Sequence, residues 1–430
     1  MNLGERPGPT DPTRDPTPSD HRPLHEPSPT IKQKNFDLLL AGLRRPGPIA
    51  LNRPLQLFIE VTSACNLRCV KCALSYDLSL NKGSMIPFSV FSRLSDFFDA
   101  AVEVQTFGFG EMFLYPFLRN LVELLKRHDC RVAGVTNGTH LREADVEWLV
   151  ANRYDDLTFS IDGATAETMR RLRGADLGHI LERLDRIAEA KATAKSRFPR
   201  IIVNFVAQAD NFRELPELVR LLTSRNVFFL GVNPLHHVYG PSGPYEEYYE
   251  KHCLGTVSRA EFEAVIAEAA RLAETAGIQF QNYVSPDFEW RPSRAADVAS
   301  QLQDDEASEP LPAMYCRYPW TTLYLAANRT AKVCCYMSQH ENLGTFSTVA
   351  DAADVWNGPK LMEVRDAIRK GRVHPACRQC VRHRTYETHG AVMRGIRESL
   401  AQSNSLVGAP AQFRTPVHES VHSSVLSGIG

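Results

Sequence analysis

Short apolar runs alternate with segments of helical periodicity from residue 55 onward. The apolar runs are typical of buried strands and fall at residues 55–61, 102–107, 131–135, 156–161, 201–207 and 227–232. The segments with apolar residues at helical spacing are 88–101, 117–128, 144–151, 180–194 and 215–224. Strands that alternate with helices predict βαβ units and a parallel sheet. Because such crossovers are almost always right-handed, six units curl into a barrel or an open portion of one.

The chain outside this alternation has a different character. Residues 1–30 hold eight of the 27 prolines, and we expect them to be disordered because they cannot bury enough apolar surface to offset their ordering entropy. Residues 31–43 place their apolar side chains on one stripe, which predicts a helix that covers one end of the main domain. Residues 31–54 are thus interpreted as an N-terminal helix and linker. Residues 401–430 lose all periodicity, and we expect a disordered tail there.

A second, smaller domain is predicted after the barrel. Residues 259–276 have the pattern of an amphipathic helix, and residues 278–280 are strand-like. The acidic stretch 301–310 is typical of a linker. We therefore expect a main domain at 55–300 and a small domain at 311–400.

The composition of the chain reduces the number of functional classes to consider. The chain has 430 residues, of which 43% are hydrophobic and 23% charged, as in ordinary globular proteins. A net charge of −1 gives no sign of a nucleic-acid or membrane partner, and no apolar run is long enough to span a bilayer. The N-terminus lacks the apolar core of a signal peptide, so we expect a cytoplasmic protein. Ten cysteines in such a chain indicate metal binding more than disulfides.

Three of those cysteines form one motif. Cys65, Cys69 and Cys72 lie within eight residues, directly after the strand predicted at 55–61. Iron–sulfur clusters are held by cysteine thiolates in short-spaced runs of this kind. Three ligands on a four-iron cluster leave one iron open to another molecule. Zinc remains an alternative if a fourth ligand comes from elsewhere in the chain, although zinc sites usually show two CxxC-like pairs.

This CxxxCxxC motif follows a strand that reads Leu-Phe-Ile-Glu-Val-Thr, and it resembles the signature of the radical S-adenosylmethionine (radical SAM) enzymes. The resemblance implies an α/β fold with a partial (β/α)6 TIM-like barrel and the cluster at the carboxyl ends of the strands. It also implies that the open iron binds the amino and carboxylate groups of SAM. An electron from the cluster then cleaves SAM to a 5′-deoxyadenosyl radical, which abstracts hydrogen from the substrate.

Polar or glycine-rich segments follow the next strands in turn. Phe107 to Glu111 resembles the family's Gly-Gly-Glu segment, whose backbone binds the methionyl amino group, although Met112 stands where proline is common. Ser160 to Gly163 resembles the family's Ser-x-Asp-Gly. An arginine near residue 173 is where relatives bind the SAM carboxylate. Each segment alone also fits a turn or a surface residue. The implied cofactor-binding residues are Phe109, Gly110, Glu111, Asn137, Ser160, Asp162 and Arg173.

The loop after the sixth strand supplies candidates for the substrate side. His236 and Tyr239 lie at the same mouth of the predicted barrel. We expect them to orient the substrate or to act as acid and base, with simple exposure of a loop histidine as the alternative.

A second group of cysteines lies near the C-terminus. The sequence predicts a β-hairpin with a thiol at each end, a helix at 359–370 and a CxxC knuckle. Four thiolates from three places can converge on one iron–sulfur cluster or one zinc ion. Residues 316–380 resemble the auxiliary-cluster domain of the SPASM/Twitch subfamily, and no cysteine for a second auxiliary cluster follows Cys380. The implied ligands are Cys316, Cys334, Cys377 and Cys380, with Cys335 as an alternative to Cys334.

The resemblance implies a radical SAM oxidoreductase or isomerase that takes electrons from flavodoxin or ferredoxin. We expect a polar small-molecule substrate, such as a sugar or aminocyclitol, that is oxidised or epimerised, because residues 1–54 are too short and proline-rich for a peptide-recognition domain. An epimerisation would need a hydrogen donor, for which Cys253 and Tyr239 are candidates. One alternative is a maturase of a ribosomal peptide or protein. Another is a non-catalytic iron–sulfur scaffold.

Overall fold

A curved sheet forms the centre of the computed structural model, which describes residues 29–76, 83–235, 244–284, 316–337, 341–378 and 380. In these residues one sheet has the strand order β10-β9-β8-β1-β2-β3-β4-β5-β6-β7. The barrel strands β1 to β7 all pair in parallel. Their bounds are Gln56–Ile59, Glu103–Thr106, Arg131–Thr136, Asp156–Ser160, Arg200–Ala207, Val227–Pro234 and Gln279–Asn282. The open barrel predicted from the sequence is therefore confirmed, with β7 as a seventh strand.

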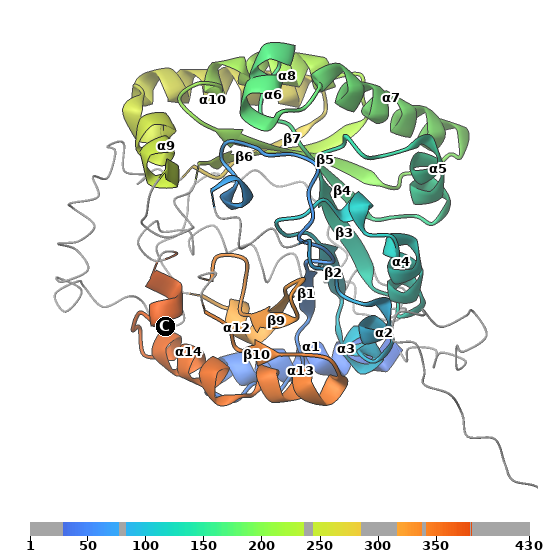
Figure 1. The fold of residues 1–430 in the computed structure, drawn as a ribbon, viewed down its shortest axis with the longest axis vertical. Coiled ribbons are helices and arrows are strands. Elements are labelled where there is room, and N and C mark those ends of the chain that lie inside the picture. The colour runs from blue at the N-terminus through green and yellow to red at the C-terminus, as the bar shows by residue number, and fades with distance from the viewer. Residues whose placement is uncertain are drawn as a thin grey trace, which may run out of the picture.

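Helices cover the convex side of this sheet (Figure 1). They are α4 (Leu118–Arg127), α5 (Glu143–Ala151), α7 (Leu177–Thr193), α8 (Leu215–Leu222) and α10 (Arg259–Thr275). The helices α6 (Ala166–Arg173) and α9 (Pro244–His252) were not predicted. The sequence of α6 is mostly polar and basic, but it carries a Thr165 N-cap and a left-handed Gly174 at its end, which are helix boundary signals.

The helix predicted at 88–101 is wrong in one respect, because two helices occupy this segment. They are α2 (Phe88–Ser92) and α3 (Ser95–Ala100). The turn between them is closed by hydrogen bonds from Arg93 N to Val90 O and from Leu94 N to Phe91 O. Ser92 and Ser95 flank this turn, and serine weakens a helix interior because its hydroxyl competes for backbone groups.

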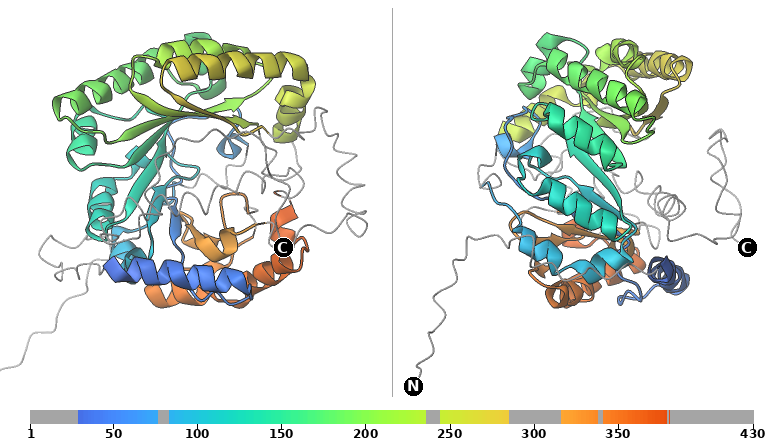
Figure 2. Two further views of the ribbon diagram at one scale, coloured as in Figure 1. Left: turned by 180° about the vertical axis from the view of Figure 1, so that it is seen from behind. Right: turned by 90° about the vertical axis from the view of Figure 1, so that its right-hand side faces the viewer.

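The C-terminal region extends the barrel sheet. Strand β8 (Thr322–Leu325) pairs in parallel with β1, so that Gln56 lies opposite Thr322 and Ile59 opposite Leu325. Strand β9 (Thr330–Lys332) returns antiparallel to β8, and β10 (Gly344–Thr345) pairs with β9. Figure 2 shows this hairpin in orange, inside the curve of the sheet. Because β1 and β8 are parallel, their carboxyl ends open toward the same edge.

The N-terminal segment joins the two regions. Helix α1 (Pro29–Arg44) matches the predicted apolar stripe and lies beside α13 (Val349–Trp356) and α14 (Pro359–Arg369) at the base of the molecule (Figures 1 and 2). Asn35 Nδ2 of this helix donates to Ala100 O of the barrel region at 3.0 Å. After the helix, Asn52 Nδ2 donates to Trp320 O at 2.9 Å, and Trp356 Nε1 donates to Asn52 O at 2.6 Å, both in the C-terminal region. None of the helices in the described ranges is both long and apolar enough to cross a membrane.

Candidate active site

A cavity of about 390 Å³ opens at the carboxyl ends of the barrel strands. One part of its wall carries Cys65, Cys69 and Cys72. Another part comes from the C-terminal hairpin, which supplies Tyr324, Lys332, Cys335 and Tyr336. The remaining wall includes the expected cofactor residues Phe109, Gly110, Glu111, Asn137, Ser160 and Arg173. The structure therefore brings six of the seven expected cofactor residues to the cavity that the three cysteines line.

The cysteine loop is fixed by backbone contacts. Val70 N donates to Leu172 O at 3.0 Å, and the Cys69 thiol lies 3.7 Å from Arg173 O. Burial raises the pKa of Cys65 and raises the pKa of Cys72 to about 11, and the neighbouring thiols add to both shifts. Three thiols that line one cavity and interact electrostatically supply the type of donor set that holds a four-iron cluster with one open iron.

The loop after β2 crosses the cysteine loop at close range. A Cβ on Gly110 would lie 2.0 Å from Thr62 O, so only glycine fits. Glu111 N donates to Ala64 O at 2.8 Å. The Glu111 carboxylate accepts hydrogen bonds from Thr136 Oγ1 and Asn137 N, both at 2.7 Å. The side chain of Glu111 thus joins the loops after β2 and β3, and its backbone stays beside the cysteines.

Asn137 connects the third strand to the cysteine loop. Its Nδ2 donates to Asn66 Oδ1 at 3.0 Å and lies 3.9 Å from Cys65 Sγ. The turn that Asn137 makes is therefore part of the cavity wall.

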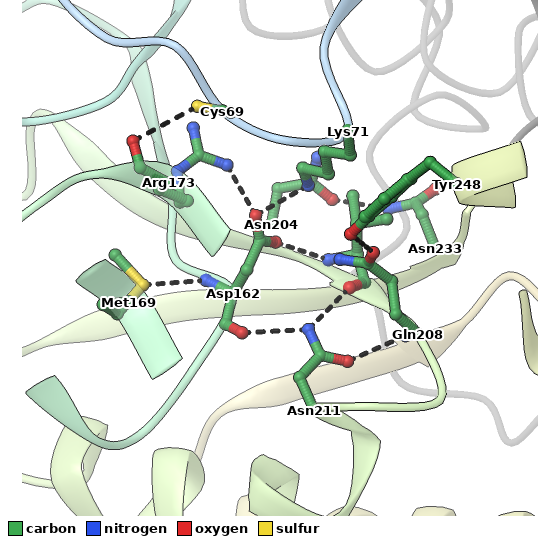
Figure 3. A network of polar contacts seen from close by, with 11 residues as sticks. Cys69, Lys71, Asp162, Met169, Arg173, Asn204, Gln208, Asn211, Asn233 and Tyr248 are labelled. Atoms are coloured by element: carbon green, nitrogen blue, oxygen red, sulfur yellow. Dashed lines mark hydrogen bonds and ion pairs between the residues drawn. The ribbon is translucent and has the colours of Figure 1, made fainter. Parts of the chain in front are cut away.

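Asp162 is the expected cofactor residue that the structure places elsewhere. It is completely buried and does not line the cavity. Its Oδ2 forms ion pairs with Lys71 Nζ at 2.7 Å and Arg173 Nη1 at 2.6 Å, and its Oδ1 accepts Val206 N at 2.8 Å (Figure 3). Burial opposes ionisation, yet the two cations hold the pKa of Asp162 below its usual value. Asp162 therefore contacts Arg173 and Lys71 in this structure, and direct cofactor binding by Asp162 stays a prediction.

Lys71 was missed by the sequence analysis. It lies between Cys69 and Cys72, lines the cavity and shares Asp162 with Arg173. Its burial lowers its pKa, and Asp162 opposes this shift. The sequence feature that could have indicated Lys71 is its position as a basic residue inside the cysteine motif. Two cations on one carboxylate favour an anionic group in the cavity.

Glu60 was also missed, although it is the one charged residue in the strand sequence at 55–61. Its Oε1 accepts Phe109 N at 2.8 Å, and its Oε2 accepts Ala327 N at 3.0 Å. Phe109 belongs to the loop after β2, and Ala327 to the turn between β8 and β9. Burial raises the pKa of Glu60, while these two hydrogen bonds and Lys332 oppose the shift. One buried carboxylate therefore joins the loop after β2 to the C-terminal hairpin.

The substrate-side candidates His236 and Tyr239 lie outside the described residues. Nearby, Pro234 and Leu235 at the end of β6 and Tyr245 of α9 line the cavity. Tyr245 contacts Tyr76, whose hydroxyl donates to Val70 O at 2.6 Å. Helix α9 is thereby attached to the cysteine loop.

The C-terminal cysteines divide into two environments. Cys334 lies in the main core, with Cys316 and Cys377 packed against that core. Burial raises the pKa of Cys316, Cys377 and Cys380, and Cys334 adds to each shift, as expected for thiols that share a space. Cys335 instead packs in a separate cluster with Phe58, Tyr324 and Ala326, and it lines the cavity. Cys335 also adds to the raised pKa of Cys380, after Cys334, Cys316 and Cys377, so Cys334 as the ligand in place of Cys335 stays a prediction.

Both groups of cysteines lie within segments that match known domains. The chain matches the Radical SAM superfamily over residues 59–205 and the iron–sulfur cluster-binding domain SPASM over residues 316–381. It belongs to the radical SAM superfamily and carries a C-terminal SPASM iron–sulfur domain. Its cofactors are SAM, a 4Fe–4S cluster that binds SAM, and an auxiliary iron–sulfur cluster. The enzymes of this superfamily need a reductant.

Individual relatives cover only part of the chain. The tungsten-containing aldehyde ferredoxin oxidoreductase cofactor-modifying protein of Pyrococcus furiosus is 28% identical over 180 residues, 40% of this chain and 49% of that protein. The mycofactocin maturase MftC of Mycobacterium tuberculosis is 32% identical over 171 residues, 38% of this chain and 42% of that protein. The matches thus span about half the length of these relatives or less.

A solved structure shares the fold over a longer span. Streptococcus suis SuiB bound to precursor peptide SuiA aligns with a TM-score of 0.54 and 16% identity, covering 77% of this chain and 70% of that chain. At this identity the likeness concerns the fold.

Proposed function

We propose that this enzyme modifies a peptide or protein by abstracting hydrogen from a residue held in the cavity between the cysteine loop and the C-terminal hairpin. The observation that carries the proposal is that one cavity has Cys65, Cys69 and Cys72 in its wall and side chains of the SPASM region in the same wall. When bound, SAM and its cluster supply the hydrogen-abstracting radical. The chain's own residues then position the SAM and the substrate.

We assign a separate role to each group of residues on the side of the cavity proposed to bind SAM. We assign Cys65, Cys69 and Cys72 to the SAM-binding cluster, and Ser160, Arg173 and the backbone of residues 109–111 to SAM. Arg173 is held by Asp162, so its guanidinium is oriented before a carboxylate arrives. Cys316, Cys334, Cys377 and Cys380 are assigned to the auxiliary cluster.

The hairpin side supports a substrate with a bulky side chain. Phe107 and Tyr324 line the cavity and contact each other edge to face, with ring centroids 6.1 Å apart. Tyr336 and Lys332 add a hydroxyl and an amine to this wall. Aromatic walls with a few polar groups suit a peptide side chain, because they bury apolar area and still orient a polar end.

The relatives give independent support for a peptide. MftC is named a maturase, and the solved SuiB structure contains a precursor peptide. The Pyrococcus furiosus relative is named as a cofactor-modifying protein, so the fold by itself does not define the substrate. These relatives favour the maturase alternative over the sugar or aminocyclitol expected from the sequence.

The test compares substrate classes on the same enzyme. Anaerobically reconstituted protein receives SAM, a one-electron reductant, and either synthetic peptides encoded by short reading frames beside its gene or a panel of amino sugars and aminocyclitols. We expect a peptide to increase 5′-deoxyadenosine formation and to change in mass. Stimulation by amino sugars or aminocyclitols alone would overturn the proposal in favour of a small-molecule substrate. Complete absence of SAM cleavage would favour the scaffold alternative.

A further inference from the structure

Helix α9 contributes to the cavity wall but packs apart from the main core. Its Tyr245 lines the cavity together with Leu235 from the end of β6. Its Tyr249 packs with Leu235 and Cys253 in a small cluster that is separate from the main core of the described residues. Cys253, considered above as a hydrogen donor, lies in this cluster and does not line the cavity. The position of α9 therefore depends on specific polar and aromatic contacts.

A series of hydrogen bonds connects α9 to Asp162 (Figure 3). Tyr248 Oη of this helix donates to Gln208 Oε1. Gln208 N donates to Asn211 Oδ1 at 2.7 Å, and Asn211 Nδ2 donates to Asp162 O at 2.9 Å. Gln208 and Asn211 are both buried, so water does not compete for these bonds. Since the Asp162 carboxylate holds Arg173, the series links α9 to the guanidinium proposed to bind SAM.

One polar group in this series lacks a partner. Gln208 is completely buried, and its Nε2 makes no hydrogen bond within the part of the chain that the structure describes. An unpaired buried donor is unfavourable, so this arrangement is less stable than a fully bonded one. Segments of low local stability respond most to added contacts. We therefore expect α9 to respond to changes at Asp162.

A second attachment joins α9 to the cysteine loop. The Tyr76 ring contacts those of Tyr245 and Tyr248, with centroids 5.3 Å and 6.5 Å apart. The Tyr76 hydroxyl donates to Val70 O at 2.6 Å, inside the cysteine motif. Both attachments of α9 thus lead to the region proposed to hold the cluster and SAM.

We propose that Tyr248 is a positioning residue that couples helix α9 to the SAM site, so that SAM binding fixes the cavity wall that receives the substrate. This inference rests on the proposed function. Once Arg173 binds the SAM carboxylate, its guanidinium and Asp162 lose mobility together. The hydrogen bonds through Asn211 and Gln208 carry this restriction to α9. A substrate that meets an already fixed helix loses less ordering entropy, so SAM and the substrate bind with positive coupling.

Hydrogen–deuterium exchange tests the coupling with SAM alone as the ligand. Reconstituted holoprotein is kept anaerobic and without reductant, so that SAM stays intact. Mass spectrometry follows peptides from α9, from the cysteine loop and from α4, with and without saturating SAM. We expect SAM to slow exchange in the cysteine loop and to slow exchange in α9 by about fivefold, the lower end of the usual coupling between two sites. Exchange in α4 should not change.

Two variants remove the link between α9 and Gln208. Tyr248→Phe deletes the hydroxyl and keeps the ring that stacks on His252. Gln208→Met removes the acceptor at nearly the same side-chain length. In both variants SAM should still slow exchange in the cysteine loop but no longer in α9. Tyr249→Phe, on the same helix but outside the series of hydrogen bonds, is the control and should respond to SAM as the wild type does.

The outcomes separate the coupling from the proposed function. Wild-type exchange in α4 shows that a variant is folded. Slowing of α9 by SAM in folded Tyr248→Phe or Gln208→Met protein to the same extent as in the wild type would overturn the role of Tyr248. Slowing confined to the cysteine loop of the wild type would overturn the coupling. No effect of SAM on the cysteine loop of the wild type would instead overturn the proposed function, which requires SAM beside these cysteines.

Discussion

At the scale of single residues, the ion pairs of Asp162 fix the orientation of the Arg173 guanidinium beside the cavity. One buried carboxylate accepts two cations and a backbone N–H. A guanidinium held in this way loses little further side-chain entropy when a carboxylate binds to it. With Arg173 proposed to bind SAM, we assign Asp162 as a positioning residue that acts on SAM through Arg173.

Replacing Asp162 by asparagine tests this role. The change leaves Arg173 and Lys71 without their shared anion, so SAM affinity should fall by about 1.5–3 kcal/mol, the usual range for a hydrogen bond to a charged group. Equilibrium dialysis with labelled SAM measures the effect, and iron content shows whether the cluster is still present. Asp185→Asn, which breaks the surface ion pair with Arg225, is the matched control. Unchanged SAM affinity in Asp162→Asn would contradict the assignment.

Buried thiols make the metal-free protein sensitive to alkaline pH. Burial raises the pKa of Cys72 and Cys334 to about 11 and that of Cys377 to about 12, from an ordinary value of 9.0. Between pH 9 and these values the unfolded chain holds fewer protons than the folded chain, so the free energy of unfolding must fall as pH rises. Urea denaturation of metal-free protein at pH 8 and pH 10 should show this loss.

The control for the pH effect removes one of the thiols. Cys334→Ala should reduce the difference between the two pH values, whereas a change at the exposed surface should not. A free energy of unfolding that stays constant or increases from pH 8 to pH 10 would contradict the burial of these thiols. Since metal ligands must lose their protons, cluster loading should release protons into a weakly buffered solution.

At the scale of elements, the pairing of β8 with β1 creates the shared cavity. Parallel strands have their carboxyl ends at one edge, so residues after β1, β2 and β8 meet there. Glu60 lies between the loops after β2 and β8. Its carboxylate accepts one backbone N–H hydrogen bond from each of these loops. Gly108 packs against it so closely that an added Cβ would lie 2.4 Å from Glu60 Cγ.

Glu60→Gln should weaken this junction. An amide has one oxygen, so its NH2 group would face one of the two N–H donors, and an unsatisfied buried group costs about 1–3 kcal/mol. We expect a drop of that size in the free energy of unfolding measured with urea. Glu189→Gln, at an exposed position on α7, is the control. Equal stability of Glu60→Gln and the wild type would show that the junction does not depend on the carboxylate.

At the scale of the whole molecule, one continuous sheet connects the two regions that contain the cysteine groups. The ten strands of the described residues run from β10 to β7, and the main core spans the barrel and the C-terminal helices. Asn35 of helix α1 donates to Ala100 O of the barrel region, and Asn52 is hydrogen-bonded to Trp320 and Trp356 of the C-terminal region. The two cluster sites are thus fixed relative to each other by the fold.

Two separate variants test whether the sites load independently. Replacing Cys65, Cys69 and Cys72 together by alanine should abolish 5′-deoxyadenosine formation and leave the iron of the auxiliary site. Cys316→Ala with Cys377→Ala should remove the auxiliary iron and leave SAM binding. Iron analysis and electron paramagnetic resonance measure both. Zinc in the SPASM region, or 5′-deoxyadenosine from the triple variant, would contradict the ligand assignment.

Local sequence determined the barrel, the SAM cysteines and the SPASM cysteines. Periods of two and 3.6 residues reflect strand and helix geometry, and the short spacing of Cys65, Cys69 and Cys72 places three thiols on one loop whatever the rest of the chain does. Dependence on the local apolar pattern also explains which helices and helix ends were predicted incorrectly. The break after Ser92 and the polar helix α6 depend on capping and turn bonds that the apolar pattern does not record.

Tertiary structure alone decided which side chains face the cavity. Gln56 and Thr322 are far apart in the chain, and no local pattern indicates that β1 and β8 pair. That pairing places Glu60 between two loops and Cys335 in the cavity wall. Likewise, Asp162 follows a strand as the cofactor residues do, but the two cations packed over it keep it out of the cavity. Burial and ion pairing arise from contacts across the sheet, so they exist only once the chain has folded.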